Sequence, residues 1–260
     1  MKKSTLFLFS AVLLHTLASA ATTACPEHYA HGVAPDVQNQ SSERKLRELC
    51  FRTFGVLHSG FTLTPLWSAE HLTPSMVMAA ATMKRKNAFH AERSLPDDER
   101  AVLDDYKGSG YDKGHMSGSG DMPDMSSQHD SFSLANMVPQ ARRINEGLWE
   151  AIEKAVRSEV SQGHSLYVIT GPLFEGGILT RIAGRVAIPT RVFKAVYDPQ
   201  AQTASAYVAT NEKTSTTKEY DVITIEELEH RLKINLFPAM PDKVKQTKVA
   251  LPQPTGPGYE

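Results

Sequence analysis

The sequence predicts an α+β domain in which a central mixed or antiparallel sheet is flanked by helices. Two observations support this fold class. The chain contains amphipathic helical segments as well as short runs of β-branched and aromatic residues bounded by turn formers. These two kinds of segment do not alternate regularly, which argues against a doubly wound parallel sheet. No internal repeat occurs, and 260 residues are enough for one domain with a large core.

The N-terminus has the features of a secretory signal peptide. Lys2 and Lys3 give a positive start, residues 6–17 form an apolar run, and residues 18–20 (Ala-Ser-Ala) resemble a cleavage site. The run is too short to span a membrane, and no later stretch reaches ~18 apolar residues. We therefore expect residues 1–20 to be removed and the mature protein to be periplasmic or secreted, with no membrane association.

The charge balance and the cysteines limit what the mature chain can do. Without Lys2 and Lys3 the formal charge changes from −1 to −3, so a polyanion would need a local basic patch. The two cysteines are Cys25 and Cys50, and in an exported protein such a pair is expected to form a disulfide. In the chain-entropy model this bond contributes roughly 3 kcal/mol and would pin an N-terminal arm, residues 21–50. The alternative is two reduced, buried thiols.

The N-terminal half predicts one helix, a strand pair and a loop. Residues 42–50 (SERKLRELC) are expected to form a short helix. Residues 55–67 carry the β-branched and aromatic residues of strands, with a turn at residues 58–60. Residues 84–107 are polar and interrupted by Leu95-Pro96, which predicts a long surface loop.

The C-terminal half predicts two helices around three strands. The first helix runs from Asn145 to about Ser161 and ends at Gly163; its apolar residues recur every three or four positions, at Leu148, Trp149, Ile152, Val156 and Val160. Strands are expected at residues 166–170, 186–197 and 204–209. Residues 224–232 predict the last helix, capped by Thr224. The folded domain is expected to cover residues 51–245, followed by a flexible tail at 246–260.

Three motifs carry residues that can do chemistry. They are Asp-Lys-Gly-His at 112–115, Asn-Met-Val-Pro-Gln at 136–140, and the helix that starts at Asn145 and carries Glu153 and Arg157. The helical offsets place Glu153 and Arg157 on one flank of the apolar stripe, with Glu153 roughly 12 Å along the axis from Asn145. At this distance Asn145 and Glu153 are not expected to be direct ligands of the same metal ion. Glu153 would instead act on it through a bound water.

In this order the motifs resemble the DNA/RNA non-specific endonucleases of the ββα-metal (His-Me finger) type, the family of the Serratia nuclease. The family pattern is Asp-Arg-Gly-His, then Asn-(Met/Ile)-Ser-Pro-Gln, then Asn-x₃-Trp-x₃-Glu-x₃-Arg. Residues 64–67, 105–111 and 167–174 are similar to further family segments, so the likeness covers about residues 50–240. The resemblance implies a sheet with a ββα-metal motif, and an Mg²⁺-dependent endonuclease acting on DNA and RNA through phosphate contacts.

The resemblance also implies a role for each matched residue. His115 would be the general base and Asn145 the sole direct protein ligand of one Mg²⁺, for which Mn²⁺ could substitute. Glu153 would hold metal-bound water and Arg85 would bind phosphate, while Asp112, Asn136 and Arg157 would support the site. Lys113 replaces the family arginine; it keeps the charge but loses the planar fork that grips two phosphate oxygens. A homodimer is compatible with the resemblance.

The chemistry of these residue types agrees with hydrolysis of a phosphodiester. Histidine supplies a base near neutral pH, and Mg²⁺ keeps most of its waters, so one amide and a water-bridged carboxylate suit it. Simpler interpretations stay open for each residue: a surface histidine in a Ser/Gly loop, Asn145 as an N-cap, a Glu153–Arg157 salt bridge, and a solvated charge run at residues 84–86.

Two other functions also stay open. One is a catalytically degenerate relative that binds nucleic acid without cutting it. The other is an unrelated zinc hydrolase, which the absence of an His-Glu-x-x-His motif or a Cys/His cluster in the sequence disfavours.

Overall fold

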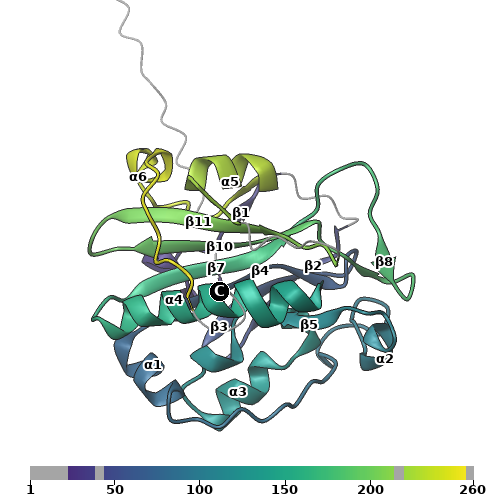
Figure 1. The fold of residues 1–260 in the computed structure, drawn as a ribbon. Helices are drawn as coiled ribbons and strands as arrows, with labels where there is room; N and C mark the ends of the chain where they lie inside the picture. The colour runs from purple at the N-terminus through teal and green to yellow at the C-terminus, as the bar shows by residue number, and fades with distance from the viewer. Residues whose placement is uncertain (1–22, 39–43, 214–219, 256–260) are drawn as a thin grey trace, which may run out of the picture.

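The computed structural model describes residues 23–38, 44–213 and 220–255. Its centre is a seven-stranded sheet with the order β12-β11-β10-β7-β4-β3-β2, in which all neighbouring strands are antiparallel (Figure 1). The strands of this sheet are β2 (Leu46–Cys50), β3 (Phe54–Ser59), β4 (Thr64–Leu72), β7 (Leu166–Leu173), β10 (Arg191–Asp198), β11 (Thr203–Thr210) and β12 (Tyr220–Ile223). The predicted α+β class with a central antiparallel sheet is confirmed.

Three two-stranded ribbons and several helices complete the described chain. The ribbons pair β1 (Asp36–Val37) with β13 (Ile234–Asn235), β5 (Asp112–His115) with β6 (Met137–Gln140), and β8 (Arg181–Ile182) with β9 (Val186–Ala187). The α-helices are α1 (Pro74–Ala80), α2 (Leu103–Tyr106), α3 (Met125–Ser131), α4 (Glu150–Ser161), α5 (Ile225–Leu232) and α6 (Asp242–Gln246). Short helical turns are η1 (Pro26–His28), η2 (Ala30–Gly32), η4 (Ser119–Asp121), η5 (Leu134–Asn136) and the π-helical η6 (Ile144–Trp149).

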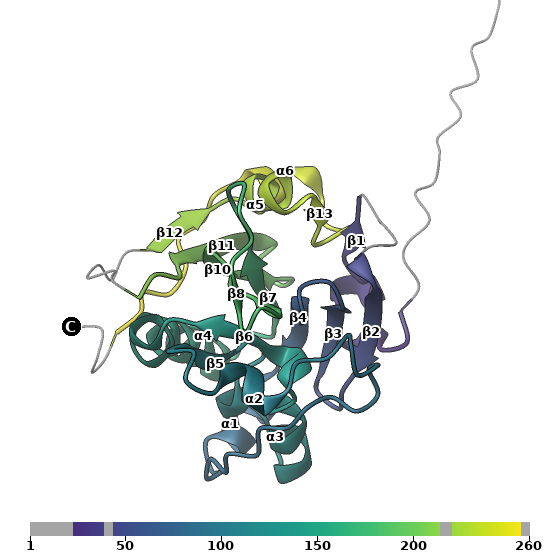
Figure 2. The same ribbon diagram turned by 90° about the vertical axis from the view of Figure 1, so that its right-hand side faces the viewer.

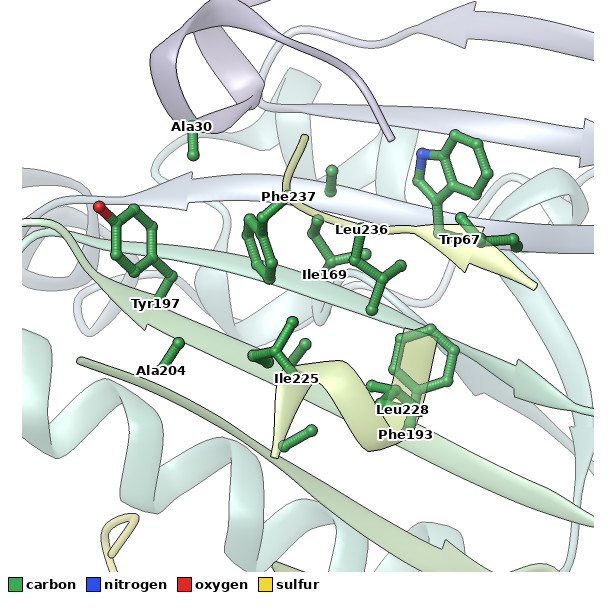
Figure 3. Packing of buried hydrophobic residues seen from close by; sticks show 14 of the residues in the cluster. Ala30, Trp67, Ile169, Phe193, Tyr197, Ala204, Ile225, Leu228, Leu236 and Phe237 are labelled. Atoms are coloured by element: carbon green, nitrogen blue, oxygen red, sulfur yellow. The ribbon is translucent and has the colours of Figure 1, made fainter. Parts of the chain in front are cut away.

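The sheet is the middle of three layers because its strands bury both faces. Successive side chains of a strand point to opposite faces, and on β10 Phe193 and Tyr197 belong to one core while Val192 and Val196 belong to the other. The first core lies under α5 and the segment that follows it (Figure 3). Trp67 contributes to this core from β4.

The second core lies between the sheet and α4, on the side that carries the candidate site. Trp149, Ile152 and Val156 pack from this helix onto the sheet, so the predicted amphipathic stripe faces a core as expected. The ribbon β5–β6 lies beside α4, and α1 and α3 lie beyond it, farther from the sheet (Figures 1 and 2). Gly163 follows the helix with φ +110°, a backbone angle that favours glycine and ends the helix.

Several predicted features are confirmed. The strands at 166–170 and 204–209 and the helix at 225–232 occur where expected, and the Thr224 side chain accepts a hydrogen bond from the Glu227 amide at 3.1 Å. The strand expected at 186–197 is instead divided into β9 and β10, and the turn expected at 58–60 lies after Ser59, because His58 and Ser59 belong to β3. Cys25 and Cys50 form the disulfide, with their Cα atoms 5.8 Å apart. The predicted signal peptide lies outside the described residues. In the described part of the chain no helix is both long and apolar enough to cross a membrane.

The predicted helix at residues 42–50 is wrong. Residues 39–43 lie outside the described part of the chain, and Leu46–Cys50 forms the edge strand β2, paired with β3 from Leu46↔Ser59 to Cys50↔Gly55. Helix propensity is weak in so short a segment. Pairing with β3 satisfies the backbone groups of one side of β2, and the disulfide holds the end of this strand.

Two further expectations need correction. The loop expected at 84–107 has little regular structure but ends in α2, whose Leu103–Tyr106 falls within it. The tail expected at 246–260 is not free along its first part. Gln246 ends α6, Leu251 is buried in the second core, and the Tyr207 hydroxyl donates to the Pro252 carbonyl.

Candidate active site

His115 ends the strand β5 and is held between two aromatic rings. The antiparallel register pairs His115 with Met137 of β6. The His115 ring centroid lies 4.9 Å from that of Phe132 and 5.7 Å from that of Phe89. The residue is 7% exposed, and its Nε2 is shielded from solvent with no hydrogen-bond partner among the described residues. His115 is therefore not a surface histidine.

Burial, together with the nearby charge of Arg85, lowers the pKa of His115 from 6.5 to about 3. Both causes disfavour the imidazolium form. The imidazole is consequently neutral at pH 7 and has a lone pair available to accept a proton.

Gly114 is required in β5 for a spatial reason. A glycine here could be expected to let the chain bend, but the described glycines with positive φ do not include Gly114. A Cβ atom at this position would lie 2.6 Å from the Gln140 Cβ of the paired strand. The absence of a side chain at Gly114 lets β5 and β6 pair closely and so places His115.

Asn136 connects the segments on both sides of the imidazole. Its Oδ1 accepts from the Ser68 hydroxyl at 2.7 Å and from the Ser117 amide at 3.0 Å. Its Nδ2 donates to the carbonyls of Ser117 and Ser131, both at 2.9 Å. Ser117 follows His115 by two residues and Ser131 precedes Phe132, so Asn136 joins the segments around the imidazole to β4.

Asn145 lies in the π-helical turn η6 and lines a cavity of about 330 Å³. Its Nδ2 donates to Asp112 Oδ2 at 3.1 Å, which orients the amide. No donor among the described residues bonds its Oδ1. Asn145 does not act as an N-cap here, because η6 begins one residue earlier and is continuous with α4.

Glu153 and Arg157 lie on the cavity wall but do not pair with each other. Arg157 Nη1 instead contacts Asp121 Oδ1 at 2.7 Å, an ion pair that the sequence did not suggest. Burial lowers the pKa of Arg157, but the charges of Asp121 and Glu153 outweigh it and raise this pKa. Burial raises the pKa of Glu153, while Lys194 and Arg157 oppose that shift. No hydrogen bond or ion pair to a described residue holds the Glu153 carboxylate.

Arg85 reaches the same cavity from the segment after α1. Its Nη1 donates to Ser119 Oγ at 3.1 Å, and its guanidinium lies 5.3 Å from the Phe132 ring centroid. The next residue anchors the segment, because the Lys86 amide donates to Gln128 Oε1 at 2.8 Å. Arg85 is exposed, like Lys84 and Lys86, but its guanidinium is hydrogen-bonded at the cavity.

Lys113 is the one residue predicted to be catalytic that does not line the cavity. Its Nζ lies 4.8 Å from the Phe89 ring centroid and 5.6 Å from that of Tyr106. Phe89 is also one of the two rings that flank His115. This placement does not support the expected phosphate contact and gives Lys113 a position behind the aromatic wall.

The donor set of the cavity fits a hydrated Mg²⁺ ion. Besides Asn145, the carboxylates of Glu146, Glu150 and Glu153 line it. In the described part of the chain, the one group of His, Cys and carboxylate atoms close enough to enclose a metal is Cys25, Glu48 and Cys50, and its cysteines form the disulfide. One free amide oxygen among carboxylates that do not converge suits an ion that keeps most of its waters.

Several residues of the site carried no recognisable signal in the sequence. They are Ser119, Asp121, Gln128, Phe89 and Phe132. The Ser/Gly stretch before Asp121 was the one sequence feature related to them. Glycine is needed at position 118, because a Cβ there would lie 2.6 Å from Asp121 Oδ2. Tight packing of that kind depends on residues distant in sequence and cannot be read from composition.

Comparison with known proteins finds a matching family model and several related nucleases. The family model described as DNA/RNA non-specific endonuclease matches residues 32–243. Nuclease C1 of Cunninghamella echinulata var. echinulata is 33% identical over 155 residues, covering 55% of this chain and 62% of its own length. The mitochondrial nuclease of Saccharomyces cerevisiae is 31% identical over 211 residues, covering 71% of this chain and 64% of its own length.

A solved structure shows the same fold. A chain in the crystal structure of the EndoG/EndoGI complex superposes with a TM-score of 0.66 at 24% identity, over 78% of this chain and 92% of that one. Human mitochondrial endonuclease G is 31% identical over 140 residues, 47% of its length, so the chain spans about half to two thirds of these curated relatives. Because the family model covers most of the sequence, the chain belongs to the DNA/RNA non-specific endonuclease family.

Proposed function

We propose that this chain is an exported, Mg²⁺-dependent endonuclease that hydrolyses phosphodiester bonds of DNA and RNA without discriminating between the sugars. One observation carries the proposal: a single cavity is lined by a buried imidazole, an amide oriented by an acid, an unpaired carboxylate and a fixed arginine. These are His115, Asn145, Glu153 and Arg85. Family membership supports the reaction class.

His115 would take a proton from the attacking water. Its pKa is lowered to about 3, so the imidazole is in the basic form at pH 7. Because Nε2 is the shielded nitrogen, Nδ1 is the one assigned to accept the proton. The tilted ring of Phe89 and the edge-to-face ring of Phe132 would hold the imidazole in one orientation.

Arg85 would bind the phosphate oxygens. Its guanidinium lines the cavity and is held by Ser119, so little side-chain entropy is lost when substrate binds. In a site of low dielectric its charge offsets the charge that develops on the phosphate. Contacts of this type address phosphate and not base edges, which agrees with cleavage of many sequences.

Asn145 would bind Mg²⁺ through its amide oxygen, and Glu153 would hold a water of the ion. When bound, Mg²⁺ would stabilise the negative charge on the phosphate and on the leaving 3′ oxygen. Asp112 would keep the Asn145 oxygen turned toward the ion by accepting from Nδ2. Nucleic acid would thus be the partner, and Mn²⁺ would be expected to replace Mg²⁺.

Plasmid digestion with EDTA, followed by addition of single metals, tests the proposal. We expect EDTA to stop cleavage, Mg²⁺ or Mn²⁺ to restore it, and matched DNA and RNA substrates to be cut. Retarded migration of DNA without cutting would show a degenerate binding protein. Rescue by zinc alone would show a zinc hydrolase.

Export rests on the sequence features of residues 1–20 together with the disulfide. Expression of the full chain with mass spectrometry of the periplasmic and culture fractions tests it. The expected mature protein begins at Ala21, and intact protein that keeps residues 1–20 in the cytosol would contradict export.

A further inference from the structure

A lysine and a glutamate are buried in the sheet directly beneath the active-site helix. Lys194 of β10 is 2% exposed and Glu70 of β4 is 1% exposed. Lys194 lies between Val192 and Val196 on the sheet face that packs against α4, where the alternating pattern calls for an apolar residue. Burying a charge costs several kcal/mol unless other charges compensate it, so a lysine at this position requires an explanation.

The contacts of Lys194 place its ammonium group under the start of α4. Its Nζ donates to Thr170 Oγ1 of the adjacent strand at 2.8 Å. The same atom lies 5.6 Å from the Trp149 ring centroid. Trp149 and Glu153 are four residues apart, and residues at that spacing share one face of a helix.

Five charged groups act on the Glu153 carboxylate, and Lys194 is one of the two cations among them. They are Lys194 of β10, Glu70 of β4, Asp121 of η4, and Glu150 and Arg157 of α4. Arg157 is already paired with Asp121 at 2.7 Å. Of these groups, Lys194 acts most strongly on Glu153 and favours its anionic form, against burial and against Asp121.

Glu70 is the second unusual group of this cluster. Both of its carboxylate oxygens are shielded from solvent and have no hydrogen-bond partner among the described residues. Burial and Asp121 raise the pKa of Glu70, while Lys194 lowers it. Glu70 therefore forms no direct ion pair with Lys194, and the charge of Lys194 acts on both Glu70 and Glu153.

We propose that Lys194 is a positioning residue of the nuclease site, whose buried positive charge keeps Glu153 an anion that faces the cavity. Lys194 does not touch substrate and acts only through Glu153. This inference rests on the proposed function, since Glu153 matters there as the group that holds water of the metal ion.

The test is the replacement Lys194→Met, which keeps the length and apolar stem of the side chain and removes the charge. Binding of Mn²⁺ at pH 7 is measured by electron paramagnetic resonance, and kcat and KM on plasmid DNA are measured separately. We expect Mn²⁺ affinity and kcat to fall by about 10- to 100-fold, as for other residues that support metal-binding groups. KM should change little, because Lys194 is not accessible to DNA.

Two further variants separate this role from a purely structural one. The first is the double variant Lys194→Met with Glu70→Gln. In the single variant the buried Glu70 carboxylate loses the positive charge that opposes it, and the second change removes this carboxylate. The double variant should therefore recover thermal stability but still bind Mn²⁺ weakly. It also serves if the single variant does not fold. The matched control is Lys245→Met, which removes another buried lysine, one paired with Glu229 at 3.0 Å between α5 and α6. That variant should lose stability and keep wild-type Mn²⁺ affinity.

The outcomes distinguish this inference from the proposed function. Wild-type protein that neither binds Mn²⁺ nor cuts DNA would overturn the proposed function itself. If the wild-type protein is active but the Lys194→Met and double variants bind Mn²⁺ as tightly as it does, or more tightly, the proposed role of Lys194 is wrong and the proposed function stands. Tighter binding would mean that Lys194 simply repels the metal ion.

Discussion

The environment of His115 sets both its chemistry and the way in which it should be tested. Replacement by alanine would leave a void between Phe89 and Phe132, so loss of activity could reflect loss of packing. His115→Gln fills more of that space but is not a base. We expect kcat to fall by about 10²- to 10⁴-fold, with DNA affinity retained because Arg85 is untouched. Single-turnover cleavage and gel retardation check this. A glutamine variant that cuts within a few-fold of wild type would contradict the assignment.

Asn145 and Asp112 offer a graded test of metal binding. Asn145→Ala removes the amide oxygen, whereas Asp112→Ala removes only the acceptor that orients the amide from 3.1 Å. We expect the first variant to need far more Mg²⁺ for activity, and the second to lose about 10-fold in metal affinity, as is usual for residues that orient a ligand. Titration of the cleavage rate with Mg²⁺ measures both. Equal Mg²⁺ dependence in wild type and Asn145→Ala would exclude Asn145 from the site.

At the scale of elements, the pairing of β5 with β6 determines where His115, the proposed base, lies. Gly114→Ala would bring a Cβ within 2.6 Å of the Gln140 Cβ, an atom too near the backbone to move aside. We expect about 1–3 kcal/mol of destabilisation and a loss of kcat as the end of β5 shifts. Chemical denaturation and kinetics test this. Gly177→Ala is the control, because a Cβ added at Gly177 would have no neighbouring atom within 4 Å and the φ of this residue is not positive.

The disulfide links the N-terminal segment to β2, which forms one edge of the sheet; β12 forms the other edge. Replacing both cysteines by serine should lower stability by roughly 3 kcal/mol and the thermal midpoint by roughly 10 °C. The active site lies elsewhere, so kcat at 25 °C should stay near wild type. Thermal unfolding with and without reductant measures the effect. If reductant does not change the thermal midpoint of the wild-type protein, the prediction is wrong.

At the scale of the whole molecule, buried neutral histidines should make the fold sensitive to acid. Burial lowers the pKa of His58 to about 4 and, with Arg85, that of His115 to about 3, against an ordinary value of 6.5. Below pH 6.5 the unfolded chain takes up protons that the folded chain does not, so stability falls from pH 6.5 down to the folded pKa values. For His58 alone the loss is on the order of 3 kcal/mol.

His58→Gln tests this pH dependence. Glutamine can still donate to the Glu99 carbonyl, which His58 Nε2 meets at 2.8 Å, but it does not titrate. Denaturation between pH 4 and pH 7 should show a flatter profile for the variant. The carboxyls of Glu70 and Glu229 oppose the trend, because burial raises their pKa and they gain protons more readily in the folded state. A profile as steep as that of wild type would show that His58 is not responsible.

The sequence by itself determined the features that depend on local spacing. The stripe of α4 follows from the helical period and the start of α5 from its Thr224 cap, which bonds the Glu227 amide. The two cysteines of the chain could pair only with each other within it. The motifs in order identified His115, Asn145, Glu153 and Arg157, which line the cavity, because the family pattern carries their spacing. Other lining residues, such as Ser119 and Gln128, were not identified in this way.

Only the tertiary structure decided which distant groups become partners. Leu46–Cys50 is a strand because β3 lies beside it, and local propensity favoured a helix. Arg157 pairs with Asp121 and not with Glu153, and Lys113 lies against Phe89 and not in the cavity. The charge state of His115 also depends on burial between segments far apart in sequence. Sequence spacing sets which side of an element a residue occupies, but the packing of the layers determines what lies opposite it, and desolvation there sets its pKa.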